Sequence, residues 1–175
     1  MKTVLIVVDY QNDFVDGALG FPGAEKLEGA ICQKIEAAAQ AGGDVIFTFD
    51  THRDDYLETK EGRDLPIPHC LEGTPGWELY GRVKDCHTPQ TKAFCKETFG
   101  SLALAEYLSG MPYEQVELVG LVSNICVLSN AVLARAALPR ARIRIDAACT
   151  LGPDPALHQK ALDVMQGLGI EVYNR

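Results

Sequence analysis

The sequence predicts a single α/β domain over residues 1–175, with a doubly wound, Rossmann-like, mostly parallel six-stranded sheet and helices on both faces. Three observations support this fold class. Short β-branched runs alternate along the chain with segments of helical period. The first run, residues 4–8, is continuously apolar, as in a strand covered on both faces. The chain has 175 residues, 47% of them hydrophobic, which suits one substantial core.

The first part of the chain is predicted to form a strand, a helix and a second strand. Residues 4–8 are the first strand. Apolar residues then recur at helical spacing between residues 27 and 41, where two glycines end the pattern. Residues 44–49 are the second strand. Residues 50–76 have no convincing period and predict a long loop, and long loops in compact domains are usually functional.

The second part of the chain continues the alternation of strand and helix. Ser101 can cap one helix, Pro139 ends the next, and Asp154 caps the last. The predicted helices run from residue 101 to 109, from 125 to 138 and from 154 to 169, and the predicted strands are residues 91–95, 116–120, 142–145 and 170–173.

Charge and cysteine content exclude several classes of protein. The formal net charge is −8, from 24 acidic and 16 basic residues, which disfavours nucleic-acid binding. The apolar run at residues 4–8 is too short for a signal peptide or a membrane span, so we expect a cytoplasmic protein that does not bind membranes. Six cysteines without a CxxC pair argue against a zinc ribbon or a thioredoxin motif. We also expect a homo-oligomer.

Candidate site residues follow from the predicted topology. In a doubly wound sheet, ligands bind beside the carboxyl ends of the strands, where loops and helix N-termini converge. Four positions lie at such ends: Asp9, residues 50–52, residues 95–96 and residues 123–126. We therefore expect these segments to meet at one crevice.

Three of these residues could carry nucleophilic chemistry. Cys126 stands at the start of a predicted helix, where free N–H groups and the dipole would lower the thiol pKa and could bind an oxyanion. The alternative is a buried structural cysteine. Asp9 could accept the thiol proton, or could instead cap a loop or bind magnesium. Lys96 could pair with Asp9, although Lys92 is a competing candidate and a solvated lysine is the simpler interpretation.

A metal site is the second candidate feature. Asp50 and His52 are two residues apart, so their side chains leave the same face of an extended segment. His69 follows in a proline-rich stretch that could return to them. One aspartate and two histidines suit Zn²⁺, Mn²⁺ or Fe²⁺. The spacing alone does not exclude two unrelated loop histidines.

Taken together, these segments resemble the isochorismatase-like cysteine hydrolases and, within that superfamily, nicotinamidases. The resemblance covers nearly the whole chain. Its motifs occur in this order: Val8-Asp9-Tyr10-Gln11-Asn12-Asp13-Phe14, Asp50-Thr51-His52, Pro68-His69-Cys70, Gly73-Thr74, Lys96, and Gly120 to Cys126-Val127.

The resemblance implies a role for each matching residue. It implies a catalytic triad of Asp9, Lys96 and Cys126. It implies a divalent transition metal, with zinc favoured over manganese or iron, and the ligands Asp50, His52, His69 and a further Glu61. It also implies a cis peptide between Val122 and Ser123, which would turn the N–H groups of Val122 and Cys126 towards an oxyanion. Phe14 and Trp77 are candidates to flank an aromatic ring.

The implied reaction is the hydrolysis of nicotinamide to nicotinate and ammonia, through an acyl-thioester on Cys126. Three departures put the exact amide in doubt: residues 97–101 after Lys96 lack the tyrosine-serine pair of many relatives, Ser123-Asn124 replaces the commoner threonine-aspartate pair, and Pro66 stands close to a tryptophan position of some nicotinamidases. The enzymatic alternative is a related amidohydrolase that acts on a carbamoyl or ureido compound. Alternatives from other classes are a receiver-like phosphoacceptor domain, which would leave Cys126 and both histidines without a role, and a flavin-binding module.

Overall fold

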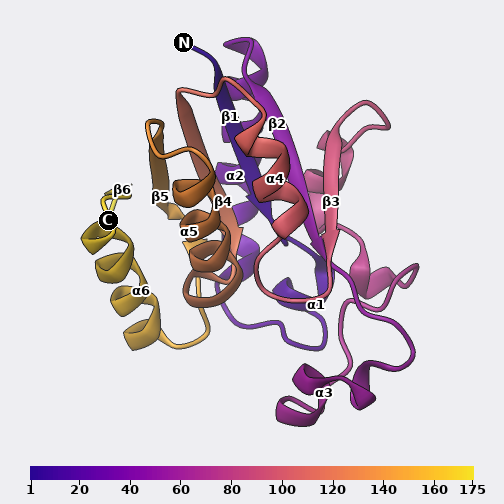
Figure 1. The fold of residues 1–175 in the computed structure, drawn as a ribbon. Helices are drawn as coiled ribbons and strands as arrows, with labels where there is room; N and C mark the ends of the chain where they lie inside the picture. Colours follow the sequence, from indigo (N-terminus) through magenta and orange to yellow (C-terminus); the bar gives the residue numbers. More distant parts are fainter.

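A computed structural model describes all 175 residues and has a central sheet with helices on both sides (Figure 1). The strands lie in the order β3-β2-β1-β4-β5-β6, and every neighbouring pair is parallel. The predicted fold class is therefore confirmed. The strands are β1 (Thr3–Val8), β2 (Asp44–Asp50), β3 (Lys92–Lys96), β4 (Gln115–Leu121), β5 (Arg142–Leu151) and β6 (Glu171–Tyr173). The helices are α1 (Asn12–Val15), α2 (Leu27–Gln40), α3 (Lys60–Asp64), α4 (Leu102–Ser109), α5 (Leu128–Ala137) and α6 (Pro155–Gly167).

Strand β1 is apolar from residue 4 to residue 8 and contributes side chains to two hydrophobic cores. Its alternate side chains point to opposite faces of the sheet. Ile6 is buried in the core beneath α4, α5 and α6, whereas Leu5 and Val7 are buried in the core beneath α2. Figure 1 shows these helices on the two faces. The double coverage explains why β1 lacks the polar alternation of a half-exposed strand.

The strand order places a crevice at the carboxyl end of β1. This strand is bonded to both β2 and β4, so the chain winds outward from it in two directions. Loops that leave β1, β2, β3 and β4 must diverge there, which opens space for a ligand. In Figure 1 the short helices α1 and α3 lie at this edge of the sheet.

The helix-start predictions hold at two positions. The Ser101 hydroxyl accepts the N–H of Leu104 at the start of α4, and the Asp154 carboxylate accepts two N–H groups at the start of α6. The helix predicted from residue 125 differs, because it begins as a π-helical turn over Ser123–Val127 before α5. None of the helices is both long enough and apolar enough to cross a membrane.

The predicted loop at residues 50–76 contains local structure that the sequence pattern did not reveal. Thr59 caps the short α3 by accepting the N–H of Gly62. A Cβ at Gly62 would lie 1.9 Å from the carbonyl oxygen of Tyr56, so only glycine fits there. This close approach folds α3 back towards the carboxyl edge of the sheet.

Candidate active site

Asp9, Lys96 and Cys126 meet at the carboxyl edge of the sheet. Asp9 follows β1, Lys96 ends β3, and Cys126 lies in the π-helical turn after β4. The Nζ of Lys96 is 2.6 Å from Oδ2 of Asp9 and 3.6 Å from Sγ of Cys126. All three residues are buried. The structure therefore brings one acid, one cation and one sulfur within bonding reach.

Lys96, rather than Lys92, is the lysine of this cluster. Lys92 lies at the opposite end of β3, where its exposed ammonium lies over the ring of Tyr107. Lys96 also contacts Oδ1 of Asp50 at 3.2 Å and donates to the carbonyl oxygen of Thr98. These contacts hold the ammonium between two carboxylates.

Burial sets the protonation of the cluster. Burial and the neighbouring Asp9 raise the pKa of the Cys126 thiol well above its usual range, and the Lys96 charge opposes this only in part. Burial likewise raises the pKa of the Asp9 carboxyl against the effect of Lys96. The expectation of a lowered thiol pKa is therefore wrong, because desolvation of the buried sulfur is the largest influence on it. The sulfur in this environment is a protonated thiol at neutral pH.

Asp9 and Cys126 contact the same ammonium. Nζ of Lys96 lies 2.6 Å from Oδ2 of Asp9 and 3.6 Å from Sγ of Cys126. The hydroxyl of Thr48 donates to Oδ1 at 2.6 Å, and the Asp9 backbone adopts a left-handed conformation at φ 43°. Thr48 and Lys96 thus orient the carboxylate from two sides.

The turn before Cys126 carries a cis peptide at a different bond from the one predicted. The bond lies between Leu121 and Val122 instead of between Val122 and Ser123. The N–H of Val122 donates no hydrogen bond within the protein. It remains available as a donor beside the Cys126 sulfur.

Asp50, His52, Glu61 and His69 form a second cluster beside the first. One donor atom from each lies within 4.8 Å of all the others. The Nε2 atoms of His52 and His69 are 2.9 Å and 3.3 Å from Oδ2 of Asp50. Oε1 of Glu61 is 3.8 Å and 3.6 Å from the same two nitrogens. Four side chains therefore bring one possible metal-ligand atom each into the same small space.

The donor chemistry of this cluster fits a divalent transition metal. His69 Nδ1 lies 2.8 Å from the carbonyl oxygen of Ile67. A proton on Nδ1 donates to that carbonyl and leaves Nε2 free to bind a metal, the arrangement usual for histidine ligands. Two imidazoles and two carboxylates are ligands that Zn²⁺ accepts. When protons rather than a metal occupy the Nε2 atoms, hydrogen bonds from His52 and His69 and the charge of Lys96 outweigh burial and hold the pKa of the Asp50 carboxyl well below its usual range.

A cavity of about 50 Å³ lies between the two clusters. It is lined by Cys126, by Asp50, Glu61 and His69 of the second cluster, and by Phe14, Leu19, Leu65, Phe99, Val122 and Ile125. Phe14 is thus placed beside the sulfur, and its ring centroid lies 5.6 Å from that of His69. A ligand in this cavity would contact apolar side chains, the sulfur and the second cluster at once.

Trp77, the second residue predicted to flank a ring, does not line this cavity. Its ring packs against Phe49 at a centroid distance of 5.1 Å, and its Nε1 donates to the hydroxyl of Thr51. The side chain fills space behind β2. A lone tryptophan in a loop carries no sequence signal that separates these two placements.

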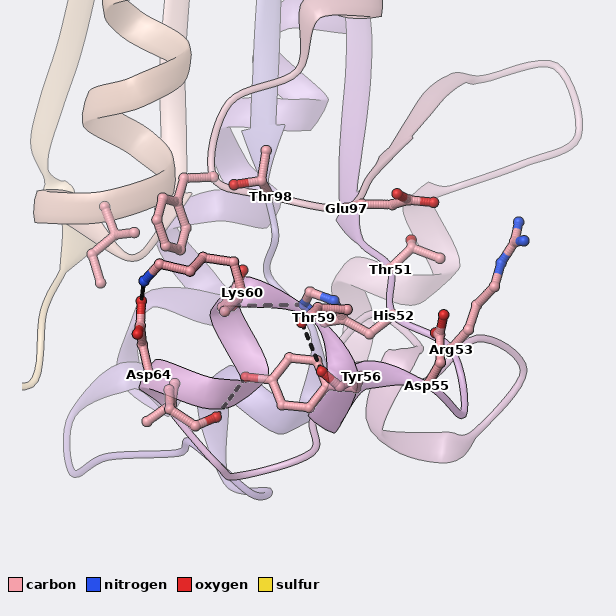
Figure 2. Close-up of a pocket in the computed structure, with 14 residues that line it drawn as sticks. Thr51, His52, Arg53, Asp55, Tyr56, Thr59, Lys60, Asp64, Glu97 and Thr98 are labelled. Atoms are coloured by element: carbon pink, nitrogen blue, oxygen red, sulfur yellow. Dashed lines mark hydrogen bonds and ion pairs between the residues drawn. The ribbon is translucent and has the colours of Figure 1, made fainter.

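A larger groove of about 530 Å³ leads to the cavity from outside (Figure 2). The groove and the cavity share Glu61, Leu65, Phe99 and Ile125. The Tyr56 hydroxyl donates to the Leu65 carbonyl. Figure 2 shows the ion pair of Lys60 with Asp64 on the wall formed by α3. Phe99 and Ile125 line both the groove and the cavity and are partly exposed, so they lie at the entrance to the cavity.

Gln11 and Asp13 hold the loops that carry the second cluster. The side-chain amide of Gln11 bonds to both backbone groups of Asp50 and to the carbonyl oxygen of Trp77. Oδ2 of Asp13 accepts the N–H of Cys70, next to His69. Gln11 and Asp13 lie within the first motif of the resemblance and Ile125 within the last, but no sequence pattern predicted a role for them. Leu65 and Phe99 carried no signal beyond their nearness to motif residues.

Comparisons with known proteins agree with this geometry. A family model described as Isochorismatase domain matches residues 3–175. The chain is 34% identical over 144 residues to an isochorismatase family protein, PncA, of Bacillus subtilis, covering 75% of this chain and 78% of that protein. It is 26% identical over 182 residues to the nicotinamidase/pyrazinamidase of Mycobacterium tuberculosis, covering 96% of each.

Solved structures show the same fold. The crystal structure of a nicotinamidase/pyrazinamidase PncA from Bacillus subtilis superposes with a TM-score of 0.87 at 31% identity, covering 99% of this chain and 100% of that one. A pyrazinamidase of Pyrococcus horikoshii, solved in complex with zinc, superposes with a TM-score of 0.85 at 26% identity, covering all of both chains. The receiver-like and flavin-binding alternatives are therefore wrong. The chain belongs to the isochorismatase family and resembles the nicotinamidases within it.

Proposed function

We propose that this protein is a metal-assisted cysteine amidohydrolase, and specifically a nicotinamidase that converts nicotinamide and water to nicotinate and ammonia. The observation that carries the proposal is the contact of Lys96 Nζ with both Asp9 Oδ2, at 2.6 Å, and Cys126 Sγ, at 3.6 Å. Of these three residues, Cys126 borders the cavity that Asp50, Glu61 and His69 of the second cluster also line. The names of the relatives support the same class of reaction.

Thiol activation is the first step. Asp9 accepts the proton of Cys126, and the Lys96 ammonium stabilises the thiolate that forms. Because burial raises both the thiol and the carboxyl pKa, the proton moves between two groups that each disfavour charge in this site. The Lys96 charge is what makes a transient thiolate accessible.

Acyl transfer follows. The thiolate forms a C–S bond with the amide carbon, and the negative charge on the carbonyl oxygen is stabilised by the N–H groups of Val122 and Cys126. The C–N bond then breaks as Asp9 returns its proton to the leaving nitrogen, which departs as ammonia. An acyl-thioester on Cys126 remains.

Hydrolysis of the thioester completes the cycle. Asp9 accepts a proton from an attacking water molecule, and the new C–O bond forms as the C–S bond breaks. The thiolate of Cys126 takes the proton back from Asp9. Nicotinate leaves, which would place the enzyme in NAD salvage.

The second cluster would hold the metal. Asp50, His52, His69 and Glu61 would bind it, with zinc favoured by the donor set and manganese or iron as alternatives. A bound divalent metal would supply an electron-pair acceptor for the pyridine nitrogen of the substrate. Phe14 would pack against the ring in the same cavity.

Ammonia release over a panel of amides tests the proposal. The panel contains nicotinamide, pyrazinamide, benzamide and a carbamoyl amino acid. We expect kcat/KM to be highest for the two amides with a ring nitrogen, and benzamide to be poor because it lacks that nitrogen. Preference for the carbamoyl compound would instead favour the related amidohydrolase, and equal rates for benzamide and nicotinamide would contradict the role assigned to the metal.

A further inference from the structure

The turn that carries Cys126 is tied to α6 by one buried hydrogen bond. Nδ1 of His158 lies 2.8 Å from Oγ of Ser123, the first residue of the π-helical turn. Both side chains are buried. His158 lies on the second turn of α6, so the bond joins two elements that are 35 residues apart.

A separate bond holds the other end of the same turn. The side-chain amide of Asn130 on α5 donates to the carbonyl oxygen of Cys126 at 2.8 Å, and its carbonyl oxygen accepts the N–H of Ser101. The Cys126 end is thus fixed from α5. At the Ser123 end, backbone N–H groups of Ile125 and Val127 bond to the Val122 carbonyl, and His158 is the only hydrogen-bond partner of the Ser123 side chain.

Ser123 stands between the groups that would react with the substrate. Val122, whose free N–H is the proposed oxyanion donor, immediately precedes it, and Cys126 follows three residues later. A shift at Ser123 would therefore move the N–H and the sulfur relative to each other. Displacements of about 1 Å in such sites can lower rates about 100-fold.

The surroundings of His158 suit an acceptor role. Burial and the nearby Arg175 lower the pKa of its ring, which favours the neutral form. A neutral ring with its proton on Nε2 accepts, at Nδ1, a hydrogen bond from the Ser123 hydroxyl. The hydroxyl is then held in one orientation, at the start of the turn.

We propose that His158 is a positioning residue, which acts through Ser123 to hold the Val122 N–H and the Cys126 sulfur in register for acyl transfer. The proposal rests on the proposed amide hydrolysis for its kinetic readout. Since His158 does not line the cavity, it should affect kcat and leave substrate binding nearly unchanged.

The test compares five variants of the full chain. Ser123→Ala and His158→Leu each remove one partner, and the double variant removes both. His158→Asn keeps a polar atom near the Nδ1 position, and Lys160→Ala is the control on the exposed face of α6. We expect Ser123→Ala and His158→Leu to lower kcat by about 10- to 100-fold with KM within about threefold, and the double variant to lose no more than the worse single variant. His158→Asn should recover most of kcat, and Lys160→Ala should match the unmodified chain.

A second readout separates this proposal from the proposed function. The rate at which iodoacetamide alkylates Cys126, followed by peptide mass spectrometry, requires no amide substrate. We expect Ser123→Ala and His158→Leu to change this rate by at least about threefold, and His158→Asn and Lys160→Ala to leave it unchanged. If the unmodified chain does not hydrolyse nicotinamide, the proposed function fails. The alkylation rates then still test whether the bond between His158 and Ser123 positions Cys126.

Three results would overturn the positioning role of His158. The first is an unchanged kcat and alkylation rate in Ser123→Ala. The second is a fold-loss of kcat in the double variant equal to the product of the two single losses, and the third is a His158→Asn variant as impaired as His158→Leu. Ser123→Ala removes only one oxygen atom, so it keeps the test valid if His158→Leu does not fold.

Discussion

The two halves of the site are built from different parts of the fold. Asp9, Lys96 and Cys126 stand at or just after the ends of β1, β3 and β4. By contrast, His52, Glu61 and His69 lie in the long excursion between β2 and β3, and only Asp50 belongs to a strand. The triad is positioned by the sheet itself, whereas the second cluster depends on loops held by side-chain contacts.

Charge compensation differs in the same way. In the triad the Lys96 ammonium lies against the Asp9 carboxylate, so the charges balance within the protein. In the second cluster two carboxylates face two imidazoles that carry a charge only when protonated. The triad therefore needs no added ion to balance its charges, while the second cluster is suited to an added cation.

The largest effect should come from the nucleophile. Cys126→Ala is expected to lower kcat by at least about 10⁴-fold, because no acyl-thioester can form. Thermal stability should change little if the role of the sulfur is chemical. Cys149→Ala, which removes a buried cysteine outside the site, is the matched control for stability and activity. Parallel loss of melting temperature and turnover in Cys126→Ala alone would indicate a core residue instead.

Lys96→Met should break the internal charge balance of the triad. The change leaves the Asp9 and Asp50 carboxylates without their shared cation, so we expect kcat to fall by about 10²- to 10³-fold and the free energy of unfolding to fall by about 3–5 kcal/mol. Urea unfolding and steady-state kinetics measure the two effects. Lys92→Met on the same strand should show neither, and a similar loss there would contradict the assignment.

The pH dependence of Cys126 alkylation should report its raised pKa. Only the thiolate reacts, so a pKa well above the usual range predicts a rate that rises about tenfold per unit between roughly pH 7 and pH 9 without a plateau. Exposed Cys95 provides the reference rate in the same sample. A plateau near neutral pH would show that Lys96 outweighs burial after all.

Removal of metal should give the smallest effect on turnover. With the second cluster emptied by a chelator, we expect KM for nicotinamide to rise about tenfold, since binding of the ring nitrogen is lost, while the triad remains assembled. Glu61→Gln should weaken metal affinity in the same direction, measured by metal content after dialysis. Glu58→Gln makes the same charge change on an exposed neighbour and should have no effect. An unchanged KM in a demonstrably metal-free sample would remove the metal from the proposal.

The same contrast explains how much the sequence could predict. The ends of the strands could be predicted from the sequence, because a run such as residues 4–8 determines where β1 stops and places Asp9 at the edge of the sheet. The path of the loop at residues 50–76 could not be predicted, because it is set by long-range contacts such as those of Gln11 with Asp50 and Trp77. The packing of Trp77 against Phe49 could not be predicted for this reason. The position of the cis peptide and the raised thiol pKa likewise depend on packing that no local pattern contains.

The carboxylate of Asp50 belongs to both halves of the site. Its Oδ1 contacts Lys96, and its Oδ2 lies between His52 and His69. An electron-withdrawing ion on one oxygen would weaken the hold of the other oxygen on the ammonium. Occupancy of the cluster would thereby adjust how strongly Lys96 favours the thiolate, and an Asp50→Asn variant would alter nucleophile and ligand affinity together. Through Asp50, the charges of the triad and of the second cluster are electrostatically coupled.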